Sequence, residues 1–437
     1  MNRTLETAAI CWKRCNRYAW PGLGVVILLI CSGASALAAA AAPGDKGLAS
    51  LIAIALSHNP GLKSAQRQAD AAALKVAPAA SLPDPEFMVE TMNNPLGSAM
   101  AENQGFEYSW RQMIPYPGKL NAAAARQRAE ADAARETYAM KAADLKKDVA
   151  LMYYGIAAMD ARLAVEYQKQ KQLEAVGAVI AARFAGGKAT LSEYIRTHNM
   201  KAMARTDSAV MAAERERMAA DLAAMLGGPI PKDTVFSADP APLKQLPKET
   251  ELVDKALAGF PELRMKRAME RRMAAEAEQM RLEPLPDFML SGALETMKNG
   301  DKTYSLGVAI PLPLFYKTKQ APLIDAAAAM REATTGERRE AENRIAQQVR
   351  ARYAALAKAN EALTLYQTAL KSGTQQAFDV ALKDYQIGRI SFSELIETFQ
   401  AVYDTLSGIE KSKQWAMEER VYLEFYTGSP LRGEEKP

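Results

Sequence analysis

The sequence predicts an α+β fold made of two similar halves, each with one β-hairpin followed by a hairpin of long helices. The chain has 437 residues and repeats itself: the segment at 59–62, NPGL, returns as FPEL at 260–263, 201 residues later. Glu193 returns as Glu394 at the same distance. Each half also has short segments with alternating apolar residues, and long stretches with apolar residues at steps of three and four. Together these features indicate a duplicated architecture of strands and packed helices.

Residues 1–40 have the pattern of a secretory signal peptide. Basic residues precede the apolar run at 22–30, and small residues follow it. A permanent membrane anchor is the alternative, but the run is shorter than the roughly 20 residues that span a bilayer.

The predicted signal peptide contains all three cysteines, so we expect the processed chain to need no disulfide. Lipid attachment at Cys31 stays open, although the bulky Ile30 precedes it. The segment carries four basic residues and one acidic residue, a net of +3 out of +4 for the whole chain. The remainder is nearly neutral, which gives no support for a nucleic-acid partner.

A proline-rich stretch at 229–249 is typical of a linker. We therefore expect a first structural repeat at 41–228 and a second at 250–437. Each repeat opens with an Ala-rich amphipathic segment, which predicts helices over roughly 48–80 and 250–283.

Two strand-like segments follow in each half. The aromatic residues at 106–111 occupy every second position, so they fall on one face of a strand, and 86–93 is its predicted partner. In the second half the corresponding segments are 287–296 and 304–310, joined by the turn-forming residues KNGD. Each half therefore predicts one β-hairpin.

Prolines mark the corners between strands and long helices. The first corner contains Pro115, Pro117 and Gly118, and the second contains Pro311 and Pro313. Because proline fixes the backbone direction and cannot donate a ladder hydrogen bond, these residues end the strands where the chain turns.

Long helices are predicted beyond the corners, where proline is absent between Pro117 and Pro229 and between Pro322 and Pro430. One helix from Asn121 to near Ala182 would be on the order of 90 Å long. A rod of this length has to pack against other helices.

Glycines interrupt both helical stretches and predict the tips of two helical hairpins. Gly186 and Gly187 lie at the first tip, and Gly388, followed by Arg389, lies at the second.

The strand segments have large apolar residues on one face, which allows two interpretations. One is a small soluble sheet packed on the helices. The other is a membrane β-barrel, which four strands cannot close, because open edges in lipid leave backbone groups unpaired. The membrane interpretation therefore requires oligomerisation, and three chains would supply twelve strands.

The chain resembles the TolC-like outer-membrane efflux proteins over almost the whole of its length after residue 40. The local features that carry the resemblance are IPYPGKL at 114–120, its echo IPLP at 310–313 and the two glycine interruptions. The first of these is similar to the heavy-metal (CzcC-like) branch. The resemblance implies a trimeric twelve-stranded β-barrel in contact with outer-membrane lipid, continued by a periplasmic α-helical coiled-coil barrel. It also implies two partners, a periplasmic adaptor protein and an inner-membrane pump of the RND type, with the hairpin tips as the adaptor-docking surface.

The resemblance also assigns a role to Glu394 and Glu397, which match the paired acids at the family's narrowest pore constriction. Residues three apart share a helix face, whereas Phe392, Leu395 and Phe399 form the packing seam. In a trimer each glutamate would form a ring of three carboxylates that favours cations. A merely solvated pair is the alternative. In the first repeat, Arg196 stands at the position of the second acid.

Few residues suggest chemistry. Met211, Met218 and Met225 recur every seven residues, as expected for helix packing; Met88, Met92 and Met100 near the first hairpin are weak candidates for metal contact. Neither His58 nor His198 has a second ligand at a suitable spacing. We find no nucleophile–base pattern or nucleotide motif and therefore expect neither an enzyme nor a cofactor.

The predicted function is a passive exit duct for substrates delivered by the pump, with metal ions as the first candidate. A duct for drugs or secreted proteins is the alternative within the same architecture. A soluble periplasmic coiled-coil scaffold is the alternative of another class, although aromatic strand faces have no evident role on a solvated rod.

Overall fold

The computed structural model describes residues 46–92, 105–237 and 246–431. The chain divides into two units, 1–43 and 44–437. The first unit, with the predicted signal peptide and Cys31, lies outside the described residues, as does Met100. The description below concerns the second unit.

The two halves have the same order of elements, which confirms the predicted duplication. The first half contains α2 (Lys46–His58), α3 (Pro60–Leu74), α4 (Val76–Ala79), β1 (Glu86–Met92), β2 (Gly105–Ile114), α5 (Lys119–Ala185) and α6 (Leu191–Leu226). The second half contains α7 (Glu249–Gly259), α8 (Pro261–Leu282), β3 (Phe288–Met297), β4 (Lys302–Ala309), α9 (Tyr316–Leu365), the π-helical turn η2 (Tyr366–Leu370), α10 (Lys371–Ile387) and α11 (Phe392–Thr427).

The predicted helices at 48–80 and 250–283 are each interrupted, so the prediction of single helices was wrong. Asn59 ends α2 and caps α3: its Oδ1 accepts a hydrogen bond from the Leu62 amide at 2.9 Å, and Pro60 begins the new helix. Phe260 and Pro261 make the same break between α7 and α8. Proline suits the first helical position because the amide there has no intrahelical partner.

The four strands form one antiparallel sheet in the order β1-β2-β3-β4. The register aligns Phe87 with Trp110, Trp110 with Gly292 and Gly292 with Leu306. Because side chains alternate along each strand, the large apolar residues of all four strands share one face: Phe87, Val89, Phe106, Tyr108, Trp110, Leu290, Leu294, Tyr304, Leu306 and Val308. The opposite face carries small and charged residues together with methionines such as Met88, Met113 and Met289.

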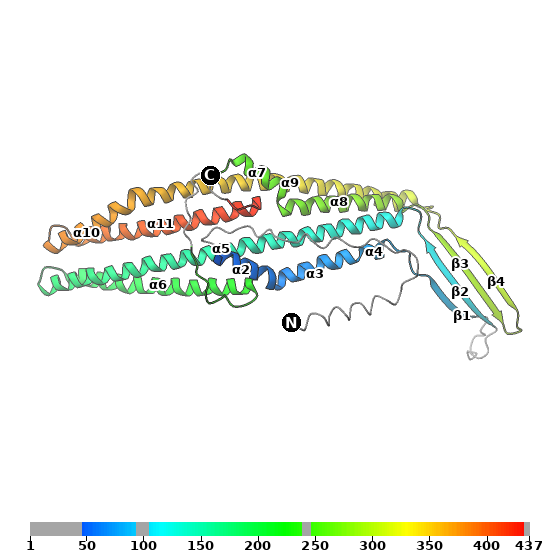
Figure 1. Ribbon diagram of the computed structural model, residues 1–437, viewed down its shortest axis with the longest axis horizontal. Coiled ribbons are helices and arrows are strands. Elements are labelled where there is room, and N and C mark those ends of the chain that lie inside the picture. Colours follow the sequence, from blue (N-terminus) through cyan, green and yellow to red (C-terminus); the bar gives the residue numbers. More distant parts are fainter. Residues whose placement is uncertain (1–45, 93–104, 238–245, 432–437) are drawn as a thin grey trace, which may run out of the picture. The chain divides into compact units, whose positions relative to one another are not determined.

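The helices run side by side, with the sheet at one end and the two helical turns at the other (Figure 1). Near the sheet, α5 packs against α3 and α8, and α8 packs against α9. Towards the turns, α5 packs against α6 and α11, and α10 packs against α11. The single helix α5 has 67 residues and so extends about 100 Å, which joins both regions.

Three apolar clusters hold the helices together. One lies beside the turns and contains Phe392, Leu395 and Phe399, which confirms the predicted seam of α11. A second joins α7 to α9 and α11 around Phe260, and a third joins α2 to α5 and α6 around Tyr153. The segment that the sequence assigns to a linker is attached there, because the Tyr153 hydroxyl donates to the Val235 carbonyl at 3.1 Å.

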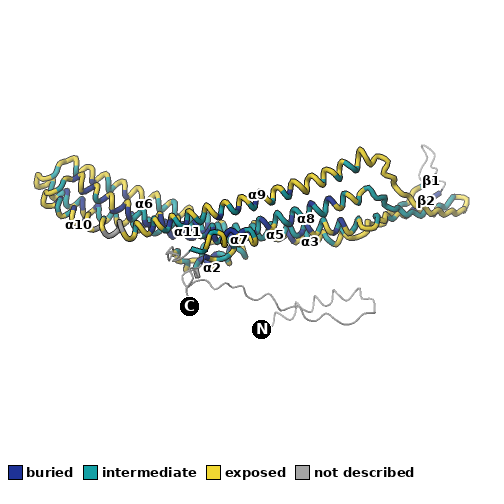
Figure 2. The backbone as a smooth tube through the Cα atoms, turned by 90° about the horizontal axis from the view of Figure 1, so that it is seen from above, coloured by how far each residue is buried: buried dark blue, intermediate teal, exposed yellow. Residues whose placement is uncertain are grey.

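The second half departs from a regular helix at η2, which the sequence did not indicate. The Tyr366 ring lies over Gly408 of α11, so close that a Cβ at Gly408 would come within 2.5 Å of the ring. The first part of α9 is mostly exposed, as Figure 2 shows, and it contains Pro322 in its second turn.

Within the described residues, no helix combines the length and apolar character that a membrane span requires.

Candidate functional site

The two helical turns lie where the glycine interruptions predicted them. Gly187 and Gly388 have φ values of +67° and +80°, a left-handed conformation that glycine adopts without steric cost. In each turn the amide of the residue after the glycine donates a hydrogen bond to a carbonyl in the last turn of the preceding helix. The Lys188 amide donates to the Arg183 carbonyl, and the Arg389 amide donates to the Asp384 carbonyl, both at 2.8 Å. These bonds close the ends of α5 and α10.

Arg183 of the first hairpin joins the second hairpin at this end of the molecule. Its Nη1 donates a hydrogen bond to the Tyr385 carbonyl, and its guanidinium lies 4.4 Å from the centre of the Tyr385 ring. Nη2 donates to the Lys188 carbonyl at 3.2 Å, so the same side chain also holds its own turn. One arginine therefore ties both tips together.

Tyr385 makes a second contact between the hairpins. Its hydroxyl donates to Glu193 Oε2 at 3.4 Å. Burial raises the pKa of Tyr385 and the Glu193 charge adds to this effect, so the hydroxyl remains protonated and able to donate. We call Arg183, Glu193 and Tyr385 the tip latch.

Glu394 and Glu397 lie on the exposed side of α11, opposite the buried Phe392, Leu395 and Phe399. Neither carboxylate forms an ion pair with a basic side chain in the described part of the chain. The Glu394 amide donates to Ser391 Oγ at 3.2 Å, so Ser391 caps the start of α11. Glu394 takes part in this cap with its backbone and not with its carboxylate. Both carboxylates are thus left available to solvent or to a ligand.

The corresponding residue of the first half has a different role. Glu193 Oε2 accepts from the Thr190 amide at 3.1 Å, while Thr190 Oγ1 accepts from the Glu193 amide, forming a capping box. Arg196, at the position of the second acid, lies 5.5 Å from the Phe392 ring of the other hairpin. The two repeats therefore have the same turn but place different charges around it.

The two corners differ in their surroundings. Pro115, Pro117 and Gly118 connect β2 to α5, and Gly118 has a φ of +101°. At this corner Asp287 Oδ1 accepts from the Tyr116 amide at 2.8 Å and lies 3.0 Å from Lys119 Nζ. The Lys119 side chain is therefore paired within the chain and largely buried.

The second corner contains Pro311 and Pro313, which connect β4 to α9. Its apolar side chains are exposed, with Leu312 at 70% and Phe315 at 72%. Asp287 of the second half thus holds the first corner in place, whereas the second corner stays exposed in the single chain.

The polar face of the sheet carries three aligned glutamates that sequence reasoning missed. Glu90 pairs in register with Glu107, and Glu107 pairs with Glu295. This row forms an acidic strip across three strands, although like charges directly opposite each other destabilise a sheet. Alternation predicts which face each residue occupies, but only the register of three strands brings the row together.

Within the described residues, no group of three His, Cys, Asp or Glu side chains could hold a metal ion. His58 Nδ1 lies 2.7 Å from Ser57 Oγ and His198 is exposed. Met88 lies on the polar face of the sheet, between Glu86 and Glu90 in sequence.

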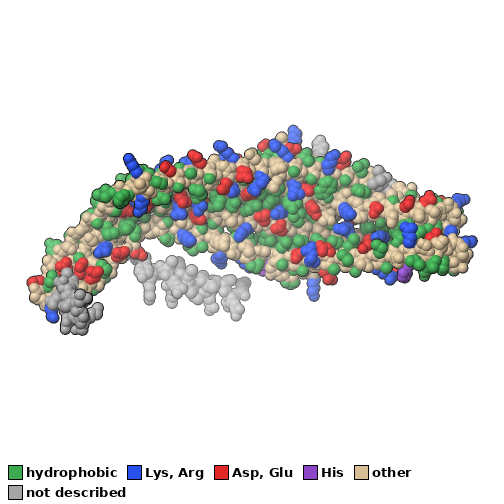
Figure 3. Space-filling model, turned by 180° about the vertical axis from the view of Figure 1, so that it is seen from behind, with side chains coloured by type: hydrophobic (Ala, Val, Ile, Leu, Met, Phe, Trp, Pro, Cys, Tyr) green, Lys and Arg blue, Asp and Glu red, His purple; other side chains and the backbone are tan. Residues whose placement is uncertain are grey.

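Charged side chains of both signs are interspersed along the helices (Figure 3). Several pairs join neighbouring helices, such as Arg215 with Asp160 and Arg272 with Glu130. Ion pairs of this kind contribute little each at the surface, but they favour one register of the packed helices.

Solved structures with similar folds are outer-membrane channels. CusC superposes with a TM-score of 0.76 at 16% identity, covering 88% of this chain and 92% of CusC. VceC from Vibrio cholerae gives 0.73 at 16% identity, covering 88% and 97%. The CmeC outer membrane channel of Campylobacter jejuni gives 0.73 at 15% identity, covering 90% and 87%. At these identities the likeness establishes the fold.

A comparison with curated proteins by sequence finds no match. The family model described as outer membrane efflux protein matches the chain twice, over residues 51–228 and 252–429, one match in each half. The chain therefore belongs to the outer membrane efflux protein family, and its place is the outer membrane, with the helical part in the periplasm.

Proposed function

We propose that three copies of this chain form a passive exit duct for cations, closed at its periplasmic end until partner proteins open it. The observation that carries the proposal is the four-stranded sheet. Its apolar face is exposed, and among the described strands its outer members β1 and β4 each pair on one side only. Unpaired backbone groups cannot face hydrocarbon without a cost of several kcal/mol each. Three copies joined from β4 to β1 would satisfy both edges.

The two faces of the sheet support this arrangement. Tyr304 and Leu306 are 81% and 84% exposed in the single chain, as a side chain facing lipid would be. With the apolar face outward, the acidic strip of Glu90, Glu107 and Glu295 faces the interior. Carboxylates lining a pore attract cations and repel anions.

The opposite end supports a gate. Rings of Glu394 and Glu397 from three copies would form a cation-selective constriction. The tip latch holds the hairpins of one chain together, so it favours the closed arrangement. Separating the hairpins would have to break the Arg183–Tyr385 and Tyr385–Glu193 contacts.

The partners would be a periplasmic adaptor and an inner-membrane pump of the RND type. The exposed turns offer the adaptor a surface that includes Gly186, Gly187, Gly388 and Arg389. A partner that binds these turns acts directly beside the latch. Divalent metal ions are the first candidate substrates, since the acidic surfaces favour cations and IPYPGKL is similar to the heavy-metal branch.

Planar-bilayer recording tests the duct and its gate. The wild-type channel should prefer cations, and Glu394→Gln with Glu397→Gln should reduce that preference and increase conductance. Glu216→Gln with Glu340→Gln removes the same charge from two exposed glutamates elsewhere and should have little effect. Unchanged selectivity and conductance in the first variant would remove the gate role. Deletion of the chain should increase cell sensitivity to divalent metals if these are the substrates.

A further inference from the structure

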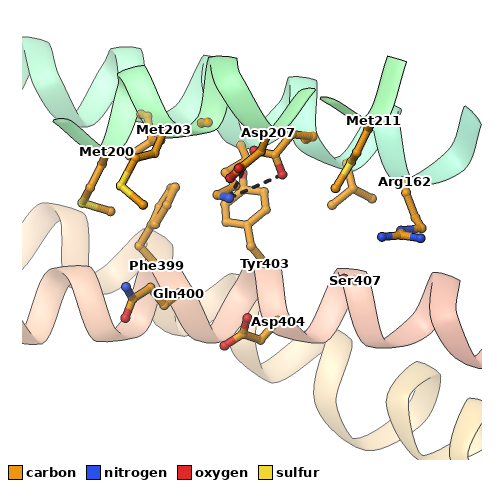
Figure 4. Close-up of a pocket in the computed structure, with 15 residues that line it drawn as sticks. Arg162, Met200, Met203, Asp207, Met211, Phe399, Gln400, Tyr403, Asp404 and Ser407 are labelled. Carbon is orange, nitrogen blue, oxygen red and sulfur yellow. Dashed lines mark hydrogen bonds and ion pairs between the residues drawn. The ribbon is translucent and has the colours of Figure 1, made fainter. Parts of the chain in front are cut away.

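A cavity of about 550 Å³ lies between α6 and α11, with α5 as its floor. It is lined by apolar, aromatic and charged side chains from the three helices, and Figure 4 shows those of Met203, Phe399 and Tyr403 between α6 and α11. We call it the inter-hairpin groove. Its volume falls within the range of pockets that bind drug-sized molecules, roughly 300–1,000 Å³.

The floor and walls of the groove combine apolar and polar side chains in nearly equal share. Met200, Met203 and Met211 of α6 face Phe399 and Tyr403 of α11 (Figure 4). Thioether side chains are flexible and polarizable, so they adapt to ligands of different shape. The aromatic rings offer electron-rich faces that attract a cation.

The acidic groups leave an excess of negative charge. Lys169 Nζ lies 3.1 Å from Glu166 Oε1, so this buried pair is neutral overall. Asp207 and Asp404 are exposed at the rim, and neither is paired with a basic side chain in the described part of the chain. Arg162 is the remaining basic side chain of the lining and lies beside Met211 (Figure 4), so two acids oppose one base.

Tyr403 supplies a polar group without a partner. Its side chain is 6% exposed, and its hydroxyl makes no hydrogen bond to any described residue. Burial, with a contribution from the Glu166 charge, raises the pKa of Tyr403 to about 12, so the hydroxyl stays protonated. The hydroxyl oxygen is not enclosed by the protein, so water or a ligand in the groove can accept its hydrogen bond.

We propose that the inter-hairpin groove binds amphiphilic organic cations, with Asp207 and Asp404 holding the positive charge and the Met and aromatic side chains holding the apolar body. The Tyr403 hydroxyl would donate to an acceptor of the ligand. This inference rests on the proposed function for its biological setting. Asp404 lies seven residues after Glu397, on nearly the same side of α11, so the groove opens close to the predicted pore lining.

Fluorescence polarisation of the purified full-length protein in nanodiscs tests the groove. The cationic probe is rhodamine 6G, and the matched anionic xanthene is fluorescein. The wild type should bind the cation in preference to the anion. Asp207→Asn with Asp404→Asn should weaken rhodamine 6G binding about tenfold, because two favourable charge contacts are lost.

Two further variants make the outcome decisive. Glu216→Gln with Glu340→Gln removes equal charge outside the groove and should leave the affinity unchanged. Tyr403→Phe keeps the ring but removes the donor, and should weaken binding by a few fold. The proposal is overturned if the aspartate and control variants behave alike, if both probes bind equally, or if neither binds because another copy or a partner helix fills the groove.

The binding test is separable from the test of the duct. The variant with Glu394→Gln and Glu397→Gln should bind rhodamine 6G with wild-type affinity while its cation selectivity falls. If the wild-type protein conducts cations but does not bind rhodamine 6G, only the proposal for the inter-hairpin groove is contradicted. Retained binding in a protein that forms no channel would contradict the proposed function alone.

Discussion

Asp287 shows how one side chain can fix the join between sheet and helices. It accepts a hydrogen bond from the Tyr116 amide and pairs with Lys119, whose side chain is only 12% exposed. Asp287→Ala would leave the Tyr116 amide without its acceptor and the largely buried Lys119 ammonium with only the Glu283 carbonyl, so we expect a loss of about 2 kcal/mol in unfolding free energy.

Asp287→Asn is the matched control for this prediction. Its amide oxygen can still accept from Tyr116 while the ion pair is lost, so its cost should be clearly smaller. Thermal unfolding of the purified protein measures both changes. Equal losses in the two variants would mean that charge alone matters at this corner.

Glu270 makes the packing of α8 on α9 dependent on pH. Thr335 Oγ1 and Arg338 Nε donate to its two oxygens, each at 2.8 Å. These donors hold the pKa of Glu270 below its ordinary value of 4.5. A lowered carboxyl pKa contributes stability that is present above the ordinary value and is lost as the pH falls through the lowered pKa.

We therefore expect Glu270→Gln to be less stable than the wild type by about 1 kcal/mol at pH 7. The difference should shrink as the pH falls from about 4.5 through the lowered pKa of Glu270, because the wild-type carboxyl becomes protonated over that range. Thermal melts between pH 7 and pH 3 measure it. A difference that stays constant with pH would show that the charge of Glu270 is not the cause.

At the scale of elements, the π-helical turn η2 depends on a close contact with α11. The Tyr366 ring occupies the space above Gly408, so Gly408→Ala would force the two helices apart or shift the turn. Overpacking of this kind costs typically 1–3 kcal/mol. A lower melting temperature, measured by circular dichroism, is the expected result.

Two variants separate this contact from helix propensity. Gly373→Ala in α10 has nothing within 4 Å of the new Cβ and should be neutral or slightly stabilising. In a Tyr366→Ala background, Gly408→Ala should lose most of its cost, since the ring is gone. If Gly408→Ala still lowered the melting temperature by the full amount in that background, the clash would involve a group other than the Tyr366 ring.

The elements also show where sequence reasoning reaches its limit. Periodicity and glycine positions predicted the strands, the helix α5 and both turns, because these signals are local. The breaks at Pro60 and Pro261 were missed because the amphipathic pattern continues across them. The turn η2 was missed because nothing in the local pattern marks it; the residue against which its Tyr366 ring packs, Gly408, lies some forty residues away on another helix.

At the scale of the whole molecule, the duplication was predictable but the contacts between its halves were not. Arg183 and Tyr385 lie 202 residues apart, and their meeting depends on how two long hairpins align. The row of Glu90, Glu107 and Glu295 similarly needs the register between both halves of the sheet. Helix spacing predicted Glu394 and Glu397 on the face opposite the packing seam, where both are exposed, but nothing predicted the capping role of Glu193.

The sheet makes the sharpest prediction about assembly, because its two faces would meet different surroundings. Leu306 and Ser305 are neighbours on β4 and point to opposite faces. If the apolar face meets lipid, Leu306→Asp places a carboxylate in hydrocarbon, whereas Ser305→Asp places it in the aqueous interior. Charges on the lipid face of a barrel cost roughly 2–4 kcal/mol near the membrane centre for the basic residues and less for Asp, while interior charges are tolerated.

We expect the wild type in the outer-membrane fraction to migrate as a trimer on mild gels and as a monomer after heating. Ser305→Asp should keep this heat-sensitive trimer, and Leu306→Asp should reduce it severely. The two substitutions add the same charge at adjacent positions of one exposed strand, so a general effect of charge on folding would affect both alike. Equal trimer yields would contradict the assignment of the apolar face to lipid, and a soluble monomer in the wild type would contradict the barrel itself.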